Sequence, residues 1–191
     1  MGKFSDAIQR RHELGLNSII LIFGPRGVGK SYCALKLAET FDPFFNINNV
    51  ILADVEEFLT QVDYLVDEHV KRGDKLGARW KHYSWIIFDE IGLAVPAREY
   101  MSMLNKIVSY VAQSFRFTPV DLVAVCPYES LIDINVKLMA DFWIIVKRRG
   151  LADVYKVQLK HFRTYRDPYK TPRLCRIRIG LPSREIIQAY E

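Results

Sequence analysis

One stretch near the start of the chain constrains the fold more than any other: IILIFGPRGVGKSYCALKLAE, residues 19–39. Directly after Ser18, the stretch begins with an apolar run that is rich in β-branched residues, has the length of a strand and shows no polar alternation. Such a run is typical of a strand covered on both faces in a parallel sheet. Three glycines within six positions come next, and after them the pattern becomes helical. The stretch therefore predicts a buried strand, a flexible loop and a helix in direct succession.

The loop matches the pattern G-x-x-x-x-G-K-[ST] at every specified position, with Gly24, Gly29, Lys30 and Ser31. Main-chain N–H groups can surround a phosphate chain only if several residues are free of Cβ clashes, and the helix N-terminus adds its own amides. Lys30 would reach the β- and γ-phosphates, and the Ser31 hydroxyl would hold Mg²⁺. A chance glycine-rich turn is the alternative, but the strand-loop-helix context disfavours it. The predicted nucleotide-binding residues are Gly24, Pro25, Arg26, Gly27, Val28, Gly29, Lys30, Ser31 and Tyr32.

A second short apolar run, WIIFDEIG at 85–92, ends in two adjacent acids. Ligands of parallel sheets bind outside the carboxyl ends of the strands, so we expect Asp89 and Glu90 to face the same crevice as Lys30. Asp89 would then hold the metal, and Glu90 would orient and deprotonate the attacking water, which makes Glu90 and Lys30 the catalytic candidates. Solvated acids at a strand end are the alternative interpretation.

The loop together with IIFDE resembles the additional-strand, catalytic-glutamate class of P-loop ATPases, which includes AAA+, RecA-like and FtsK/HerA-like proteins. The resemblance covers about residues 18–150 and implies ATP hydrolysis with ATP and Mg²⁺ as cofactors. Kinases and GTPases with the same loop usually lack the second acid.

The resemblance implies two further roles. The strand after the acid pair, VDLVAVC at 120–126, would lie between the acid strand and the loop strand, and a polar residue at its tip would sense the γ-phosphate. This chain departs from the usual Gln, Asn or Thr with Cys126, so Cys126 or Tyr128 is the sensor candidate, and a packed core residue is the alternative for Cys126. A neighbouring subunit would supply an arginine to stabilise transition-state charge. The candidates are Arg98, Arg116, Arg148 and Arg149.

Apolar runs and helical stripes alternate along the rest of the chain, which predicts a doubly covered, mostly parallel sheet. We expect an α/β fold of the P-loop NTPase type with five parallel strands, a C-terminal β-hairpin over 153–161 and 174–179, and a short final helix capped by Ser183. We expect a single ATPase domain over 1–191. Its parts would be an N-terminal helix in 1–17 with Phe4 and Ile8 on one side, a core over 18–150 and a basic extension over 151–191.

The net charge of +5 lies entirely in the C-terminal part of the chain. Residues 147–191 contain 12 Lys and Arg against 4 Asp and Glu, whereas residues 1–146 contain 15 against 18. Basic residues with interleaved aromatic rings suit phosphates and bases, so DNA is the expected partner. An ordinary amphipathic hairpin edge would look similar. The nucleic-acid candidates are Arg163, Tyr165, Arg166, Tyr169, Lys170 and Arg173.

The composition restricts the expected cellular location. No apolar run approaches the roughly 18 residues that span a bilayer, and the first residues are too polar for a secretory signal, so we expect a cytoplasmic protein without a membrane segment. Cys33, Cys126 and Cys175 form no CxxC and are expected to be small core residues, without a disulfide or zinc site.

We therefore expect an ATPase motor that translocates or packages DNA, of viral or plasmid type and active as a homo-oligomeric ring. One alternative is a helicase loader similar to DnaC-type AAA+ proteins, in which the C-terminal region would be helical, whereas a β-hairpin favours the translocase. Another is a Zot-like phage assembly or secretion ATPase, although such proteins usually carry a membrane segment.

Overall fold

A computed structural model describes residues 2–52, 54–89, 97–114, 117–126, 132, 134–157 and 172–191. The helices are α1 (Gly2–Glu13), α2 (Lys30–Phe41), the 3₁₀ turn η1 (Ile47–Asn49), α3 (Val55–Lys71), α4 (Ala97–Ser114), α5 (Ile134–Met139) and α6 (Arg184–Tyr190). The strands are β1 (Ile19–Phe23), β2 (Val50–Leu52), β3 (Lys75–Leu76), β4 (Arg79–Trp80), β5 (Ser84–Asp89), β6 (Val120–Val125), β7 (Phe142–Arg148), β8 (Leu151–Lys156) and β9 (Arg173–Arg178).

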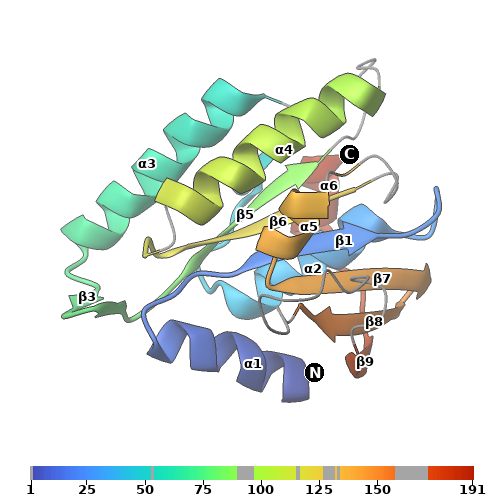
Figure 1. Cartoon of the computed structure of the whole chain (residues 1–191), viewed down its shortest axis with the longest axis horizontal. Helices are drawn as coiled ribbons and strands as arrows, with labels where there is room; N and C mark the ends of the chain where they lie inside the picture. Colours follow the sequence, from blue (N-terminus) through green and yellow to red (C-terminus); the bar gives the residue numbers. More distant parts are fainter. Residues whose placement is uncertain are drawn as a thin grey trace.

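The main sheet has seven strands in the order β2-β5-β6-β1-β7-β8-β9, and β3 and β4 form a separate two-stranded hairpin (Figure 1). All pairings from β2 to β7 are parallel, so the five expected strands are present. The predicted strand count was wrong for the sheet as a whole, because β8 and β9 join it as antiparallel strands. A sheet ending at β7 would leave a row of unpaired backbone groups at its edge, and β8 pairs with that row.

The parallel register aligns the strand ends that carry the predicted site residues. Ile22 of β1 lies opposite Val125 of β6 and Ile144 of β7, and Phe88 of β5 lies opposite Ala124. The loop after β1, Asp89 at the end of β5 and Cys126 after β6 consequently reach the same carboxyl edge of the sheet. The order also places β6 between β5 and β1, as the resemblance implied.

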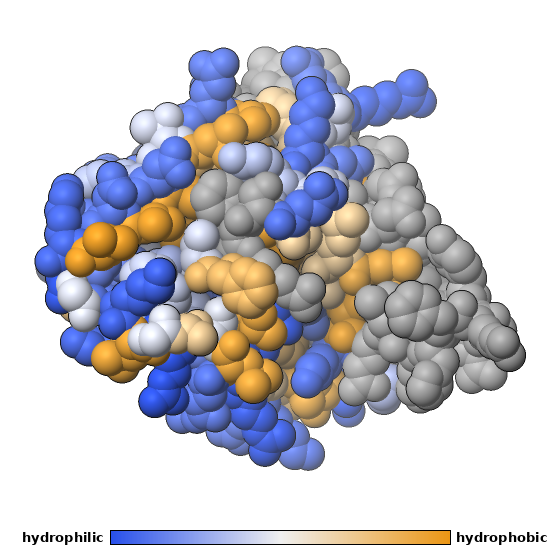
Figure 2. All heavy atoms as spheres, turned by 60° about the vertical axis from the view of Figure 1, so that its left-hand side comes forward, coloured by the Kyte–Doolittle hydropathy of each residue, from blue (hydrophilic) through white to orange (hydrophobic). Residues whose placement is uncertain are grey.

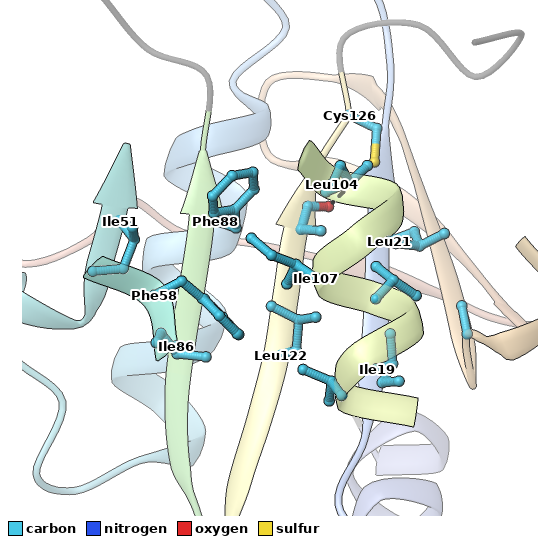
Figure 3. Packing of buried hydrophobic residues seen from close by; sticks show 14 of the residues in the cluster. Ile19, Leu21, Ile51, Phe58, Ile86, Phe88, Leu104, Ile107, Leu122 and Cys126 are labelled. Carbon is cyan, nitrogen blue, oxygen red and sulfur yellow. Dashed lines mark hydrogen bonds between the residues drawn. The ribbon is translucent and has the colours of Figure 1, made fainter. Parts of the chain in front are cut away.

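Helices cover both faces of the parallel part of the sheet. On one face, apolar side chains of α3 and α4 pack against β1, β5 and β6, and Figure 3 shows Ile107 and Phe58 among them. On the other face, α1 and α2 pack against the alternate residues of the same strands. Phe4 and Ile8 of α1 are buried there, so the predicted side of the N-terminal helix is confirmed. The strands are thereby buried on both faces, as their continuous apolar runs predicted.

Buried polar contacts close the amino edge of the sheet, opposite the predicted site. Asp121 accepts hydrogen bonds from the Ser18 backbone N–H at 2.6 Å and pairs with His12 Nε2 at 2.8 Å. His69 lies 1% exposed, with Nδ1 3.0 Å from Asp74 Oδ2 and Nε2 3.0 Å from Ser84 Oγ. Buried polar groups must be paired, and these pairs fix α1 and the end of α3 to the strands.

The outer sides of the helices are mostly hydrophilic. Figure 2 shows hydrophilic side chains around separate strips of apolar ones on one face of the molecule. Exposed apolar residues such as Val70, at 58%, are ordinary on a folded protein. Among the helices described, none combines the length and the apolar character that crossing a membrane requires.

Candidate functional site

The loop between β1 and α2 has the backbone geometry that the motif predicted. Gly24, Gly27 and Gly29 have φ values of +153°, +75° and +86°, a region that side-chain-bearing residues rarely adopt. A Cβ on Gly24 would lie 2.8 Å from the backbone oxygen of Val146 in β7. The loop thus passes so close to the neighbouring strand that only glycine fits at its first position.

The amino end of α2 is open toward this loop. Gly29 occupies the N-cap position in a left-handed conformation and provides no side-chain cap for the first amides of the helix. The first N–H groups of any helix lack intrahelical partners, and together with the helix dipole they favour an anion. This end of α2 therefore has the chemistry of a phosphate-binding helix terminus.

The Lys30 ammonium group lies over the same loop. Lys30 Nζ donates to the carbonyl oxygens of Gly24 at 3.0 Å and Pro25 at 3.1 Å. A side chain that folds back in this way holds its positive charge at the centre of the loop. Phosphate oxygens would be stronger acceptors than these neutral carbonyls, because they carry the negative charge that complements the ammonium group.

A cavity of about 840 Å³ lies at the carboxyl edge of the sheet, within the range usual for ligand sites. The phosphate-binding loop and Asp89 line one part of it. The turn between β7 and β8 and the segment between β9 and α6 line another. The lining residues are Arg26, Gly27, Gly29, Lys30, Ser31, Tyr32, Cys33, Asp89, Val125, Val146, Arg149, Gly150, Leu151, Ile179, Gly180 and Leu181.

Asp89 is the last residue of β5 and is 1% exposed, at a buried strand end facing the cavity. Its Oδ2 accepts a hydrogen bond from the Tyr190 hydroxyl at 2.8 Å, and Ser31 also interacts with the Tyr190 phenol. One hydroxyl thus joins the two residues that the sequence assigned to Mg²⁺. Carboxylate and hydroxyl oxygens suit this hard cation, so the residues present fit it.

The described residues hold no group of three or more His, Cys, Asp or Glu side chains that could bind a metal unaided. Mg²⁺ is commonly bound by one or two protein oxygens together with substrate phosphates and water. Ser31 and Asp89 beside the phosphate-binding loop suit that mode and do not suit a resident structural metal.

Several predicted residues fall outside the described part of the chain. These are Glu90, Arg116, Tyr128, Arg163, Tyr165, Arg166, Tyr169 and Lys170. Their predicted roles stay predictions.

Cys126 is fully buried beyond the end of β6 and belongs to the core cluster beneath α3 and α4. Its Sγ donates to the carbonyl oxygen of Ala124 at 3.6 Å, and it is not among the described residues that line the cavity. This position suits the packed-residue interpretation, and a sensing role stays a prediction. The thiol of Cys33 is also buried, which raises its pKa to about 12 and keeps it protonated.

The arginine candidates separate by position. Arg98 and Arg148 are exposed, at the start of α4 and the end of β7. Arg149 lines the cavity, and its Nε is 3.5 Å from the carbonyl oxygen of Gly27 in the phosphate-binding loop. Arg149 therefore lies beside the loop of its own chain, a position that the sequence did not predict.

Arg173, the one nucleic-acid candidate within the described residues, begins β9 and faces Asp153 of β8. Its guanidinium lies 3.4 Å from Asp153, which also accepts a hydrogen bond from Arg176 Nε at 2.7 Å. The Arg176 hydrogen bond is the main cause that lowers the pKa of Asp153, against the opposing effect of burial. Asp153 thus offsets part of the positive charge on this face.

Sequence reasoning missed Tyr190 and the cavity-lining segment 179–181. Tyr190 is separated from Asp89 by 101 residues, and no motif surrounds it. The only local signal was Ser183, the residue predicted to cap the final helix. Its Oγ accepts a hydrogen bond from the Ile186 N–H at 3.4 Å.

No family model and no curated protein sequence matches the chain. Among solved structures, ATPases 2 and 3 of EssC from Geobacillus thermodenitrificans match 92% of this chain at 13% identity with a TM-score of 0.52. The N-terminal domain of zonular occludens toxin from Neisseria meningitidis matches 92% of the chain at 15% identity with a TM-score of 0.40. The chain spans 42% of the EssC structure and all of the toxin domain. The likeness to EssC shows that this chain has the α/β fold of P-loop ATPase domains.

Proposed function

We propose that this protein binds and hydrolyses ATP in the presence of Mg²⁺ at the cavity beside the phosphate-binding loop. The observation that carries the proposal is the meeting of Lys30, Ser31 and Asp89 around one cavity, although Asp89 comes from a different strand. The fold of the EssC ATPase domains supports it.

Each residue has a role that follows from its position. The open amides of α2 and the Lys30 ammonium would hold the β- and γ-phosphates. Ser31 and Asp89 would hold the cation, which when bound offsets negative charge on the phosphate oxygens. Glu90 directly follows Asp89 in the sequence and would take the proton of the attacking water.

Arg149 would act on the nucleotide of its own chain, since it already contacts the loop. Among the described candidates, Arg98 and Arg148 are then the arginines available to a neighbouring subunit. In this arrangement the assembled ring would place a second guanidinium at the site.

The proposed work of this ATPase is the movement or packaging of DNA. The C-terminal extension supports the translocase over the helicase loader, because its described part consists of two strands of the main sheet and a seven-residue helix. A helicase loader would instead be expected to have a helical C-terminal region.

A motor that moves a protein is the second candidate. The pairing of Arg173 and Arg176 with Asp153 favours it, because cations held by a carboxylate are less available to phosphates. The two candidates share the nucleotide site and differ in the polymer.

The test of the nucleotide site is ATP binding measured by calorimetry with Mg²⁺. Lys30→Ala should reduce the affinity below detection, whereas Lys71→Ala, at an exposed position on α3, should bind as the wild type does. Equal affinities for Lys30→Ala and wild type would refute the proposed site.

The test of the polymer is ATP turnover with and without single- or double-stranded DNA, at low salt and across protein concentrations. Stimulation by DNA that increases with protein concentration supports a DNA motor assembled as a ring. ATP turnover that no DNA stimulates would favour the protein-moving candidate.

A further inference from the structure

The last helix of the described chain ends at the nucleotide site. Figure 1 shows α6 and the C-terminal end near the carboxyl end of β5. There the Tyr190 hydroxyl donates to Asp89 Oδ2 at 2.8 Å, and Ser31 also interacts with the Tyr190 phenol. The phenol oxygen is thus in contact with the carboxylate that would hold Mg²⁺.

The next residue makes a second contact with the same turn of α2. The Tyr32 hydroxyl is hydrogen-bonded to the Glu191 carboxylate. Tyr32 directly follows Ser31. The C-terminal end of α6 therefore contacts two successive residues at the start of α2.

The Tyr190 contact is between a neutral donor and a charged acceptor. The phenol donates its hydrogen bond to the Asp89 carboxylate at 2.8 Å. A cation at this position would need lone pairs of the Asp89 carboxylate, one of which already accepts the Tyr190 hydroxyl, so the hydroxyl and the metal compete.

The attachment of α6 is shallow. The helix has seven residues, and none of them is fully buried. Ile186 and Tyr190 are partly buried against the core cluster on the α2 side, and the Ser183 N–H donates to Glu39 Oε1 at 3.1 Å. Elements with few buried contacts open at low free-energy cost, so α6 can leave its position without unfolding the sheet.

We propose that α6 is an autoinhibitory element, in which the Tyr190 hydroxyl occupies the Mg²⁺ position and must leave before a Mg²⁺-nucleotide complex can bind. This inference rests on the proposed function. The apparent affinity for the Mg²⁺-nucleotide complex is then the intrinsic affinity multiplied by the fraction of molecules in which α6 is undocked. Anything that draws α6 away, such as a polymer or a neighbouring subunit, would activate the site.

The first test is ADP affinity measured by calorimetry with Mg²⁺ and with EDTA. Tyr190→Phe keeps the ring and removes the hydroxyl, so it should bind ADP about tenfold more tightly with Mg²⁺, as expected when one hydrogen bond to a charged group is lost. With EDTA the two affinities should agree within about twofold. Tyr64→Phe, at an exposed position on α3, is the matched control and should behave as the wild type does in both conditions.

Weaker Mg²⁺-ADP binding by Tyr190→Phe would overturn the proposal and make Tyr190 a positioning residue for Asp89. Unchanged affinity would also overturn it, while leaving the nucleotide site itself intact. Loss of ADP binding by the wild type and by both variants would instead refute the proposed function, and with it this inference.

The second test is hydrogen exchange of the wild-type full chain. Addition of Mg²⁺-ADP should increase amide exchange at Ile187 and Glu191, whose N–H groups bond to Ser183 and Ile187 in the docked helix. Increased protection of these amides would show that the nucleotide complex closes α6 and would overturn the proposal.

Discussion

The close passage of the phosphate-binding loop beside β7 predicts a difference between two glycine substitutions. In Gly24→Ala, the new Cβ would lie 2.8 Å from the Val146 backbone oxygen and 3.1 Å from Val28 Cγ2, at a φ of +153°. In Gly27→Ala, the new Cβ would meet no atom within 4 Å, at a φ of +75°. The two variants therefore share backbone strain, and only Gly24→Ala adds a clash with a neighbouring strand.

The magnitudes follow from these contacts. An L-residue in the left-handed region costs about 1–2 kcal/mol, which is the whole expected loss for Gly27→Ala. At Gly24 the strained backbone costs about 1–3 kcal/mol and overpacking against β7 a further ~1–3 kcal/mol. For a chain of this size, the overpacking alone should lower the Tm of Gly24→Ala by about 2–12 °C more than the Tm of Gly27→Ala.

The assay is urea unfolding of both variants and the wild type without nucleotide, followed by tryptophan fluorescence. Gly24→Ala should lose distinctly more free energy of unfolding than Gly27→Ala, at an unchanged dependence on urea. Equal losses would refute the reasoning, because the loop would then not be held against β7 before a nucleotide arrives.

Three further predictions concern catalysis, nucleotide contact and pH. Glu90→Gln should bind Mg²⁺-ATP as the wild type does but release phosphate about 100-fold more slowly, since it lacks a general base; wild-type turnover would exclude that role. Arg149→Ala should weaken ADP binding about tenfold at protein concentrations where the chain is monomeric, because its contact is within one chain; a loss seen only in mixed oligomers would assign the residue to a neighbour. Burial is the main cause that lowers the pKa of His69 below its ordinary 6.5, so the unfolded chain binds the proton first as the pH falls. The free energy of unfolding should decrease below about pH 6.5, and less steeply in His69→Gln; equal slopes in thermal or urea unfolding would show that His69 is not the group responsible.

The parts of the site that the sequence predicted are those encoded locally. The loop at 24–31 has a fixed spacing that reflects the shape of a phosphate, and the apolar run before Asp89 marks a strand whose end must reach the carboxyl edge. Asp54 shows the same local encoding, because its side chain accepts the Glu57 N–H at 2.9 Å and so caps the start of α3.

The parts that the sequence did not predict depend on pairing between distant segments. The alternation of β8 and β9 indicated strands, but pairing with β7 depends on the free edge of a sheet and not on the strands' own residues. Tyr190 likewise has no motif, because a hydroxyl that meets Asp89 and Ser31 is placed by the path of β9 and α6. The sequence made Arg149 a candidate only for a neighbouring subunit's site, whereas the turn after β7 places it beside the loop of its own chain.

The C-terminal extension consequently lines the same cavity as the loop after β1 and is also a candidate polymer surface. The Ile179 N–H donates to the Gly150 carbonyl oxygen at 2.9 Å, which fixes the segment after β9 to the turn that carries Arg149. That same segment leads through Leu181 to α6 and Tyr190. Arg173 and Arg176 lie on β9, only a few residues before this junction. This hydrogen bond and the short segment from β9 to α6 therefore connect the basic edge of the sheet to the turn of Arg149 and to Tyr190.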